Sequence, residues 1–540
     1  MRKNLIAMSV AAFVGGLGMA GGAAAGVVQD VSATTPTNAT VETVRGTGAG
    51  HQLLVPYYNT QNGNATLFNI VNTDVVNGKA VKVRFRGGSN SDDVFDFQVY
   101  LSPGDVWGAT ISKSAAGVAS LKTTDKSCTL PAGVGGGAAG SDFVTARLPQ
   151  TLTGDALATQ TREGYIEVFN MADIPPNLPA ADGSVSTTAN PLFTAIKHVA
   201  GVAPCTAATL NTLATDVTTS TEAYARGFRS PSASLFGNWT IVNVPKSGSS
   251  TGEAIAITAS TAGGAPARGN IVFFPQTGAA APTPDLFTAD PSLRTFAGAA
   301  AGQVSNGAAA AYGGVTPIIA ASQFDLPDLS TPYLLLAAYP PISTDPVTFA
   351  RNLTASIQTG SVTNEYLTDT NIGAFTDWVF SQPTRRYNVA PDYRPLSLTP
   401  AGALGRAFNF GLTDFYSAAN TSVSGFQICA NTAGVTYYDR EEFTAVGNNF
   451  VISPNPPAPG FRLCGETSVL TFNSTAASVL GAEIARTNFV TGSVRDGWAV
   501  VSTPGAAGGF GLPIVGKAFS AASTGTLNIG GSWEHRYTTP

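Results

Sequence analysis

Oxygen-bearing side chains gather in residues 90–96, which read NSDDVFD. Asn90, Asp92, Asp93 and Asp96 carry the ligand type that calcium prefers, because this hard cation takes about six to eight oxygens. The segment lacks the regular spacing of a dedicated calcium loop. An Asx-rich turn that satisfies its own backbone is the alternative interpretation. We predict a candidate calcium site at these four residues and no other cofactor.

A nucleophilic serine is suggested by residues 248–252, whose sequence GSSTG fits G-x-S-x-G. A nucleophile elbow needs a strand before the serine and a helix after it. Pro245 ends the preceding strand, and residues 254–258 read as another strand, so we interpret the motif as a loop. A triad would also need one of the three histidines, which are His51, His198 and His535. We expect His198 on the exposed side of a strand.

Two groups of carboxylates have the residue types of a glycosidase acid and base. One is Glu163 with Glu167, and the other is Asp439 with Glu441 and Glu442. The sequence sets no separation within either group, and the second also reads as a solvated turn. No phosphate-binding loop, dinucleotide fingerprint or HExxH motif occurs in the sequence. We therefore predict that the protein is not an enzyme.

The tryptophans could present flat faces to sugar rings. Each lies within or beside an apolar strand segment, which favours packing in the core. Carbohydrate binding stays open as the alternative. The five residues are Trp107, Trp239, Trp378, Trp498 and Trp533.

Four cysteines occur in the chain. An even number in an exported protein indicates disulfides, and no CxxC spacing points to a metal. Sequence order favours Cys128 with Cys205 and Cys429 with Cys464. Each bond would stabilise the fold by about 3–5 kcal/mol on the chain-entropy model.

The chain is poor in charge. Charged residues make up 12% of its 540 residues, about half of the usual ~25%. The formal net charge of −5 leaves no basic surface for nucleic acid. A surface of Thr, Ser, Asn, Gly and Ala repels other copies only weakly, which favours association.

The first 25 residues predict export. Arg2 and Lys3 precede an apolar run that ends in small residues, and this is the pattern of a signal peptide cleaved after Ala25. The run is too short and glycine-rich for a good membrane span, and we expect no transmembrane span elsewhere. Residues 26–50 are polar and without periodicity, and we interpret them as a flexible arm.

Alternating apolar and polar residues begin at Leu53 and predict antiparallel strands. In residues 80–86 one face carries Val81, Val83 and Phe85, and the other, directed to water, carries Lys82, Arg84 and Arg86. Asn77-Gly78 predicts a hairpin turn before this strand. Residues 95–101 and 106–111 continue the pattern as a meander.

Further strand segments, separated by long Gly/Ala-rich loops, extend this pattern along the chain, and we predict an all-β fold of antiparallel β-sandwich-like domains. Helical segments are limited to residues 206–213 and 476–485. The polar loop after residue 246 separates a first domain, 51–246, which contains Cys128 and Cys205, from a second β-rich region, 247–540, which contains Cys429 and Cys464.

Several segments resemble secreted cell surface proteins of Gram-negative bacteria, with betaproteobacterial members closest. They include NSDDVFDF, LSPGDVW, TREGYIEVFNMADI, NPLFTAIKHV and SVTNEYLTDTNIGAFTDWVFSQPTRRY. The resemblance covers most of the chain after residue 25. It implies a location, secreted or at the cell surface, and carries no catalytic residues with it.

The preferred functional hypothesis is a structural surface subunit that self-assembles into an S-layer-like lattice or an extracellular filament. Its partners would be copies of itself, with outer-membrane lipopolysaccharide or glycan as a further partner. The arm at residues 26–50 would add a strand to the next copy. A monomeric adhesin or carbohydrate-binding module is the alternative, and a secreted hydrolase is the third hypothesis.

Overall fold

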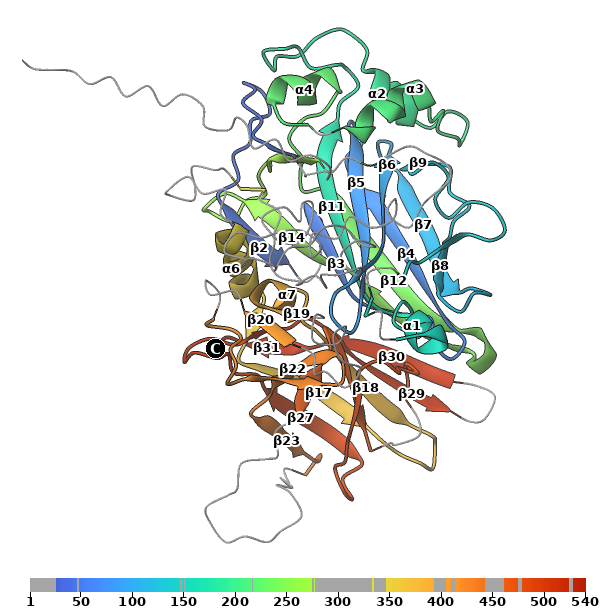
Figure 1. Ribbon diagram of the computed structural model, residues 1–540, viewed down its shortest axis with the longest axis vertical. Coiled ribbons are helices and arrows are strands. Elements are labelled where there is room, and N and C mark those ends of the chain that lie inside the picture. Colours follow the sequence, from blue (N-terminus) through green and yellow to red (C-terminus); the bar gives the residue numbers. More distant parts are fainter. Residues whose placement is uncertain are drawn as a thin grey trace, which may run out of the picture.

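The computed structural model describes residues 26–45, 48–145, 148–149, 152–215, 217–273, 276, 333–334, 346–392, 405–408, 413–441, 461–473, 478–523 and 528–540. The signal-peptide prediction lies outside these residues. The described chain consists mainly of antiparallel strands (Figure 1). The prediction of an all-β protein with antiparallel sandwich-like domains is confirmed. No described helix is long and apolar enough to cross a membrane.

The N-terminal half is a sandwich of a six-stranded and a seven-stranded sheet. The six-stranded sheet has the order β10 (Ser141–Asp142), β8 (Ala119–Lys122), β7 (Val106–Lys113), β4 (Asn64–Asn72), β12 (Leu235–Asn243) and β13 (Gly248–Glu253). The seven-stranded sheet has the order β2 (Val41–Arg45), β14 (Ile255–Ser260), β3 (Gln52–Asn59), β11 (Glu163–Ile174), β5 (Gly78–Gly87), β6 (Asp93–Leu101) and β9 (Cys128–Leu130).

Aromatic and branched side chains fill the space between these sheets. The inward residues of β5 are Val81, Val83 and Phe85, as their alternation predicts, and all three are fully buried. Phe97 of β6 meets Trp107 of β7 with ring centroids 5.4 Å apart, so the contact joins the two sheets.

The predicted hairpin at Asn77-Gly78 is wrong, and of the predicted meander only the antiparallel pairing of β5 with β6 is confirmed. β4 pairs with β7 and β12 in the six-stranded sheet, whereas β5 pairs with β6 and β11 in the seven-stranded sheet, so the chain changes sheet between β4 and β5 and again between β6 and β7. The turn at residues 73–77 crosses between the sheets. Asp74 stabilises it by accepting hydrogen bonds from the backbone N–H groups of Val76 and Asn77, both at 2.9 Å. Turn residues indicate that the chain reverses, but they do not indicate which strand it joins next.

The predicted ends of the first domain also need correction. β13 and β14 lie beyond residue 246 yet pair with β12 and β3 inside the first sandwich. Residues 26–45 are not a free arm. β1 (Gly26–Val28) pairs with β15 (Ile271–Phe273), and β2 pairs with β14. Both segments are placed by strands more than two hundred residues away, which local sequence does not reveal.

The C-terminal half is a smaller sandwich. One sheet has the order β23 (Gly434–Tyr438), β27 (Asp496–Ser502), β17 (Ser361–Leu367) and β31 (Arg536–Thr538). The other has the order β26 (Arg486–Phe489), β25 (Thr467–Phe472), β18 (Phe375–Ser381), β29 (Lys517–Ser523) and β30 (Asn528–Glu534). Smaller sheets comprise β21 (Thr421–Ser424), β22 (Gln427–Asn431) and β24 (Arg462–Cys464); β16 (Gln358–Thr359) and β28 (Leu512–Pro513); and β19 (Val389–Asp392) and β20 (Gly405–Phe408).

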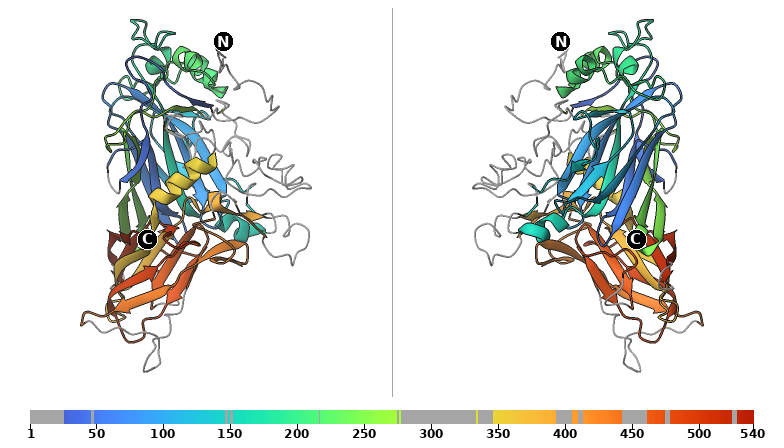
Figure 2. Two further views of the ribbon diagram at one scale, coloured as in Figure 1. Left: turned by 90° about the vertical axis from the view of Figure 1, so that its left-hand side faces the viewer. Right: turned by 90° about the vertical axis from the view of Figure 1, so that its right-hand side faces the viewer.

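Helices are short and lie at the margins of the sheets. α2 (Pro191–Ile196), α3 (Ala207–Leu210) and α4 (Ser220–Ala225) cap the far end of the N-terminal half (Figure 1). α6 (Pro346–Ser356) lies across the outer face of the seven-stranded sheet (Figure 2). The other α-helices among the described residues are α1 (Gly154–Thr159) and α7 (Arg385–Asn388). The predicted helix at 206–213 is confirmed by α3 and the 3-10 turn Asn211–Ala214, but residues 478–485 form no helix.

The two halves are stacked along the long axis and share one hydrophobic core (Figure 1). Val379, Val469 and Phe519 of the C-terminal half belong to the same buried cluster as Trp239 of β12. Trp239 and Phe519 lie 5.9 Å apart, centroid to centroid. Each half therefore buries apolar surface of the other, which stabilises their association.

Candidate functional site

The predicted calcium segment lies at the seam between the two halves. Residues 88–91 form the turn between β5 and β6 and contact the C-terminal half. The carbonyl of Gly88 accepts a hydrogen bond from the N–H of Glu466 at 2.8 Å. The side-chain amide of Asn90 donates to the carbonyl of Phe426 at 2.6 Å. The turn therefore joins the two sandwiches.

The strand beside this turn carries the residues predicted to face water, and that prediction is wrong. Lys82, Arg84 and Arg86 are all fully buried. The outer face of their sheet is covered by α6 and by Tyr387 of α7, which pack with Tyr165 and other residues of β11 and β14. Alternation shows that two faces differ in polarity, but it does not show which face water reaches.

Each of these buried cations lies beside a carboxylate. Lys82 pairs with Asp96, the Arg84 Nε lies 3.3 Å from Asp93, and the Arg86 Nε lies 3.3 Å from Glu167. Burial lowers the pKa of Lys82. Burial opposes ionisation of Asp96, but the charges of Lys82 and Arg84 hold its pKa below the usual range. Buried ion pairs need such partners because desolvation of a lone charge is costly.

In the structure, Asp93 and Asp96 pair with the cationic side chains of Arg84 and Lys82. Among the described residues, no group of three or more His, Cys, Asp or Glu side chains is arranged to hold a metal ion. Asn90 is directed to the C-terminal half, as described above. The calcium site at Asn90, Asp92, Asp93 and Asp96 therefore stays a prediction.

The G-x-S-x-G motif lies on β13, an edge strand paired with β12 along residues 248–253. Ser250 is opposite Ile241 in this ladder, so the motif has no strand-to-helix turn. Gly252 is required by packing, because a Cβ there would lie 2.5 Å from the Trp239 indole. The motif is part of a sheet, in agreement with its interpretation as something other than an elbow, although it is a strand rather than a loop.

The three histidines lie in separate parts of the molecule. His51 is buried between the Pro231 carbonyl and the Ala259 N–H, and burial lowers its pKa to about 4. His535 is buried against the Val379 carbonyl, and burial lowers its pKa to about 3. Neither ring is placed to accept a proton from an exposed serine.

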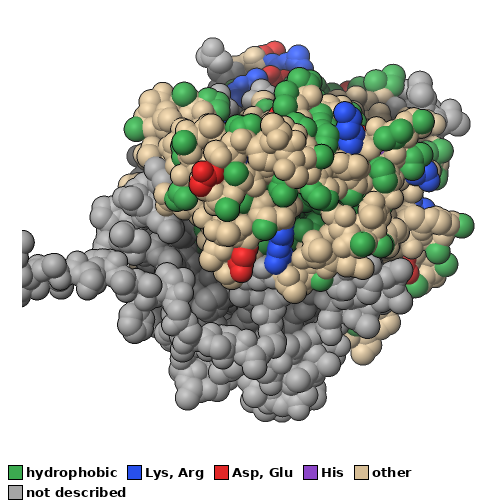
Figure 3. Space-filling model, turned by 90° about the horizontal axis from the view of Figure 1, so that it is seen from above, with side chains coloured by type: hydrophobic (Ala, Val, Ile, Leu, Met, Phe, Trp, Pro, Cys, Tyr) green, Lys and Arg blue, Asp and Glu red, His purple; other side chains and the backbone are tan. Residues whose placement is uncertain are grey.

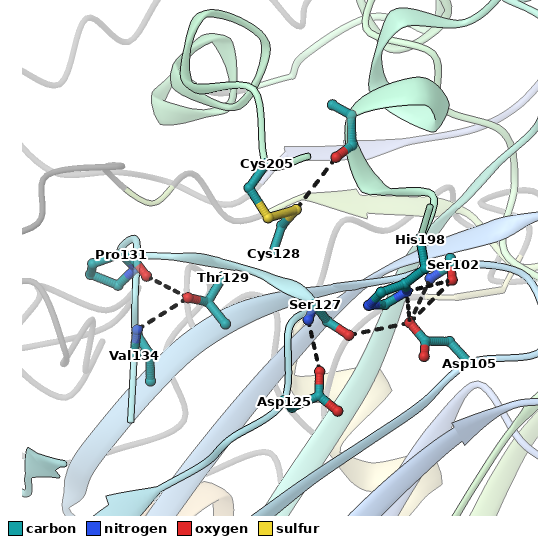
Figure 4. Close-up of a disulfide and its surroundings, with 11 residues drawn as sticks. Ser102, Asp105, Asp125, Ser127, Cys128, Thr129, Pro131, Val134, His198 and Cys205 are labelled. Carbon is teal, nitrogen blue, oxygen red and sulfur yellow. Dashed lines mark hydrogen bonds and ion pairs between the residues drawn. A yellow bond between two sulfur atoms is a disulfide. The ribbon is translucent and has the colours of Figure 1, made fainter. Parts of the chain in front are cut away.

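His198 is the histidine that comes closest to a catalytic arrangement (Figure 4). It lies in the turn after α2 rather than on a strand. Its Nδ1 is 3.0 Å from the Ser102 Oγ and 3.3 Å from the Asp105 Oδ2. In a triad the serine and the aspartate contact different ring nitrogens. Here both contact the same nitrogen, so the group acts as a turn-stabilising cluster.

Glu163 and Glu167 are both buried and both already engaged. The two Glu163 oxygens accept hydrogen bonds from the Tyr57 hydroxyl at 3.0 Å and from the Glu483 N–H at 2.8 Å, and burial raises its pKa to about 7. Asp439 accepts from the Glu441 N–H at 2.8 Å, which is a turn contact. Glu442 lies outside the described residues. These positions stabilise structure rather than forming a pair around an open cleft.

The contact between Glu163 and Glu483 belongs to a set that fastens residues 478–484 to the N-terminal half. The side-chain amides of Asn59 and Asn64 both donate to the Leu480 carbonyl, at 2.8 and 2.6 Å. The side-chain amide of Asn62 donates to the Gly481 carbonyl at 2.9 Å. This loop and the turn at 88–91 lie close together, since the Gln427 side-chain amide donates to both the Ser89 Oγ and the Ile484 carbonyl, and both connect the two halves.

The raised pKa of Glu163 predicts that ionisation of this side chain lowers the free energy of unfolding. Since its folded pKa is about 7 and its ordinary value 4.5, stability is lost as pH rises between these values. Glu163→Gln keeps an oxygen acceptor without the charge. We expect the stability of this variant, relative to wild type, to improve by about 3 kcal/mol between pH 4.5 and pH 8. Urea unfolding at the two pH values measures this difference.

Glu167→Gln is the matched control, because it removes the charge that faces Arg86. We expect this variant to be less stable than wild type at both pH values, since it leaves a buried cation without its carboxylate. If Glu163→Gln changed the free energy of unfolding by the same amount at both pH values, the prediction would be wrong.

The tryptophans divide into core and surface residues. Trp107, Trp239 and Trp378 are buried, whereas Trp498 is 40% and Trp533 50% exposed. Trp498 stacks on Tyr438 with centroids 4.2 Å apart, which leaves an aromatic pair at the surface of the C-terminal half.

Both predicted disulfides are confirmed. Cys128 on β9 is bonded to Cys205, which fastens the loop after α2 to the seven-stranded sheet (Figure 4). Cys429 on β22 is bonded to Cys464 on β24, directly opposite in the strand register. Each bond closes a loop within one half, so the disulfides strengthen the sandwiches and not the seam.

The end of the N-terminal half remote from the seam exposes aliphatic side chains, a feature that the sequence analysis missed. We call these six residues the valine end. Their exposed fractions are 78, 56, 50, 74, 68 and 52% for Val75, Val76, Val106, Val185, Val199 and Val202. Seen from above, this end shows apolar and uncharged atoms with few charges (Figure 3). The available signal was the Val-Val pair inside the polar turn TDVVNG.

Contacts between loops make the valine end one surface. The turn at residues 73–77 meets the turn at 102–105, where the Gly104 N–H donates to the Asp74 carbonyl at 3.0 Å. Ser102 in turn contacts His198, beside Val199. Val76 and Val185 line one pocket of about 240 Å³, together with Thr34, Thr35, Asn77, Asp173, Pro175, Pro176, Asn177, Leu178, Pro179, Ser186, Arg229 and Arg268.

The described structure thus defines a two-sandwich, disulfide-bonded β protein with an apolar end. Comparison with protein-family models, with curated proteins and with solved structures finds no match to the chain. The resemblance to secreted cell surface proteins therefore stays a prediction.

Proposed function

We propose that the protein is an exported structural component of the cell surface that assembles with copies of itself through the valine end. The carrying observation is the exposure of six valines on loops that contact one another at one end of the molecule. Large exposed apolar patches mark interaction sites, because water is released when they are covered. The partner is taken to be a second copy, since nearly uncharged surfaces of identical chains repel one another weakly.

The distribution of charge supports this assignment. Few charged residues occur in the chain, and many of them are buried in ion pairs instead of covering the surface. The fully or almost fully buried ones include Lys79, Lys82, Arg84, Arg86, Asp93, Asp96, Glu167, Asp173, Arg385 and Glu466. These buried pairs leave fewer charged side chains at the surface of a chain whose charged content is only 12%.

The extensive contact between the two halves fits the same role. The loop at residues 478–484, the turn at 88–91 and a shared core connect the halves, so a force applied at one end is transmitted through the molecule. A lattice or filament needs subunits whose contact surfaces keep a fixed relative orientation. A monomeric adhesin that uses the Tyr438–Trp498 pair to hold glycan is the second candidate.

Negative-stain electron microscopy of the purified protein tests the proposal. We expect ordered sheets or fibres from wild type. Val75→Ser with Val76→Ser should weaken association about tenfold or more, because each valine contributes about 1.5 kcal/mol when buried. Val244→Ser is the matched control, since Val244 is 79% exposed but lies on the turn between β12 and β13.

Dispersed wild-type particles at every concentration would contradict self-assembly. If such particles also bound a glycan array through Trp498, the adhesin function would replace it. Equal assembly of the valine variant and its control would show that the valine end is not the contact.

A further inference from the structure

Residues 26–45 are held by elements that are remote in sequence. β1 pairs with β15, and β2 pairs with β14 from Val41 opposite Ser260 to Arg45 opposite Ala256. Between the two strands, Asp30 accepts hydrogen bonds from the Tyr224 hydroxyl at 2.8 Å and the Ser230 N–H at 3.0 Å. The segment is therefore attached along its length to residues that are remote in the sequence.

The place of β2 in the sheet permits such an exchange. β2 is the outermost strand of the seven-stranded sheet. The chain then passes to the other side of β14, where Gln52 of β3 lies opposite Ile257. The connection at residues 46–50 reads GTGAG, and Gly48 has a φ of +132°. Because glycine adopts such conformations freely, a different backbone conformation at Gly48 would redirect β2 without disturbing β3.

We propose that residues 26–45 are exchanged between copies in the assembly, so that β1 and β2 of one copy complete the sheets of the next. The inference rests on the proposed function and names its partner, a second copy of this chain. When copies exchange this segment, each sheet keeps the strand contacts that it has within a single chain. The free-energy cost is therefore limited to the change of backbone conformation near Gly48 and to the association of the copies.

Residues 26–45 also lie at the valine end, so the exchanged strands and the apolar contact would belong to the same interface. Thr34 and Thr35 line the same pocket as Val76 and Val185. Val31 is itself 65% exposed. An exchanged segment would thus cross the surface at which the copies meet, and both contacts would join the same pair of molecules.

A pair of cysteines across the exchanged ladder distinguishes the two arrangements. Thr43 lies opposite Thr258, and opposed residues in antiparallel strands have Cα atoms about 4.5–5.5 Å apart, a distance suited to a disulfide. The full chain carrying Thr43→Cys and Thr258→Cys is allowed to assemble, oxidised and run on a denaturing gel without reductant. We expect a ladder of covalent multimers that collapses to monomer when reductant is added.

The control carries Leu67→Cys and Thr240→Cys, which face each other in the middle of the six-stranded sheet. We expect this pair to give monomer only. A monomer band from the Thr43/Thr258 variant, with assemblies visible by microscopy, would overturn the exchange and leave the proposed function standing. Dispersed particles from wild type overturn the proposed function and the exchange with it.

Discussion

Replacing Arg385 by alanine should lower the free energy of unfolding by about 3–5 kcal/mol. The Arg385 side chain is 1% exposed and lies at the seam. Its Nη1 donates to the carbonyls of Ile428 and Gly465 at 2.6 and 2.7 Å, its Nη2 donates to the Ser89 carbonyl at 3.3 Å, and its Nη2 lies 2.7 Å from the Glu466 carboxylate. Without the guanidinium, these groups remain buried without this partner, and the turn at 88–91 loses one attachment to the C-terminal half.

Arg440→Ala is the matched control for this experiment. Arg440 also pairs with a carboxylate, Asp496, at 2.9 Å, but its side chain is 74% exposed. Water screens such a pair, so we expect a change of less than about 1 kcal/mol. Urea unfolding followed by circular dichroism measures both variants at neutral pH. A similar, small effect for the two arginines would show that the seam does not depend on Arg385.

Acid is expected to destabilise the protein by several kcal/mol between pH 6.5 and pH 4, because His51 and His535 are buried in neutral form. Burial lowers their pKa values from 6.5 to about 4 and about 3. Below pH 6.5 the unfolded chain binds protons that the folded chain excludes. Stability is therefore complete above pH 6.5 and falls as pH decreases toward the folded values.

The size of this effect follows from the linkage between proton binding and folding. Each histidine lowers the free energy of unfolding by about 1.4 kcal/mol for each pH unit below 6.5. By pH 4 the upper estimate is about 3 kcal/mol for each histidine. Glu163 acts in the opposite direction between its ordinary pKa of 4.5 and about 7. Variants of single residues are needed to separate these contributions.

His51→Gln and His535→Gln test the prediction individually. Glutamine retains hydrogen-bonding capacity but does not titrate, so the slope of unfolding free energy against pH should fall by about 1.4 kcal/mol per pH unit for each. His198→Gln is the control, because the His198 side chain is 20% exposed and lies in a surface turn. An unchanged slope in the first two variants would contradict the assignment.

Much of the fold could be predicted because it depends on local pattern. Alternation in residues 80–86 correctly assigned Val81, Val83 and Phe85 to the core of a strand. The disulfides Cys128–Cys205 and Cys429–Cys464 followed from the number and order of the cysteines, and the structure confirms both. These features are encoded in neighbouring residues or in residue type.

The candidate site could not be predicted in the same way. Asn90 was predicted to be a calcium ligand, but the structure directs its side-chain amide to the carbonyl of Phe426, 336 positions away. The Val75-Val76 pair was not singled out in the sequence, and the loops that lie beside it come from distant segments. Surfaces built from distant segments leave no periodic signal along the chain.

The sequence alone therefore determined the β class, most of the strands, the cysteine pairing and the scarcity of charge. Only the tertiary structure decided which strands pair, that residues 26–45 close a sheet, and that Arg84 is buried. The physical reason is that side-chain alternation distinguishes the two faces of a strand but not what covers each face. A polar face looks the same in the sequence whether it meets water or, as here, buried carboxylates and the other half of the protein.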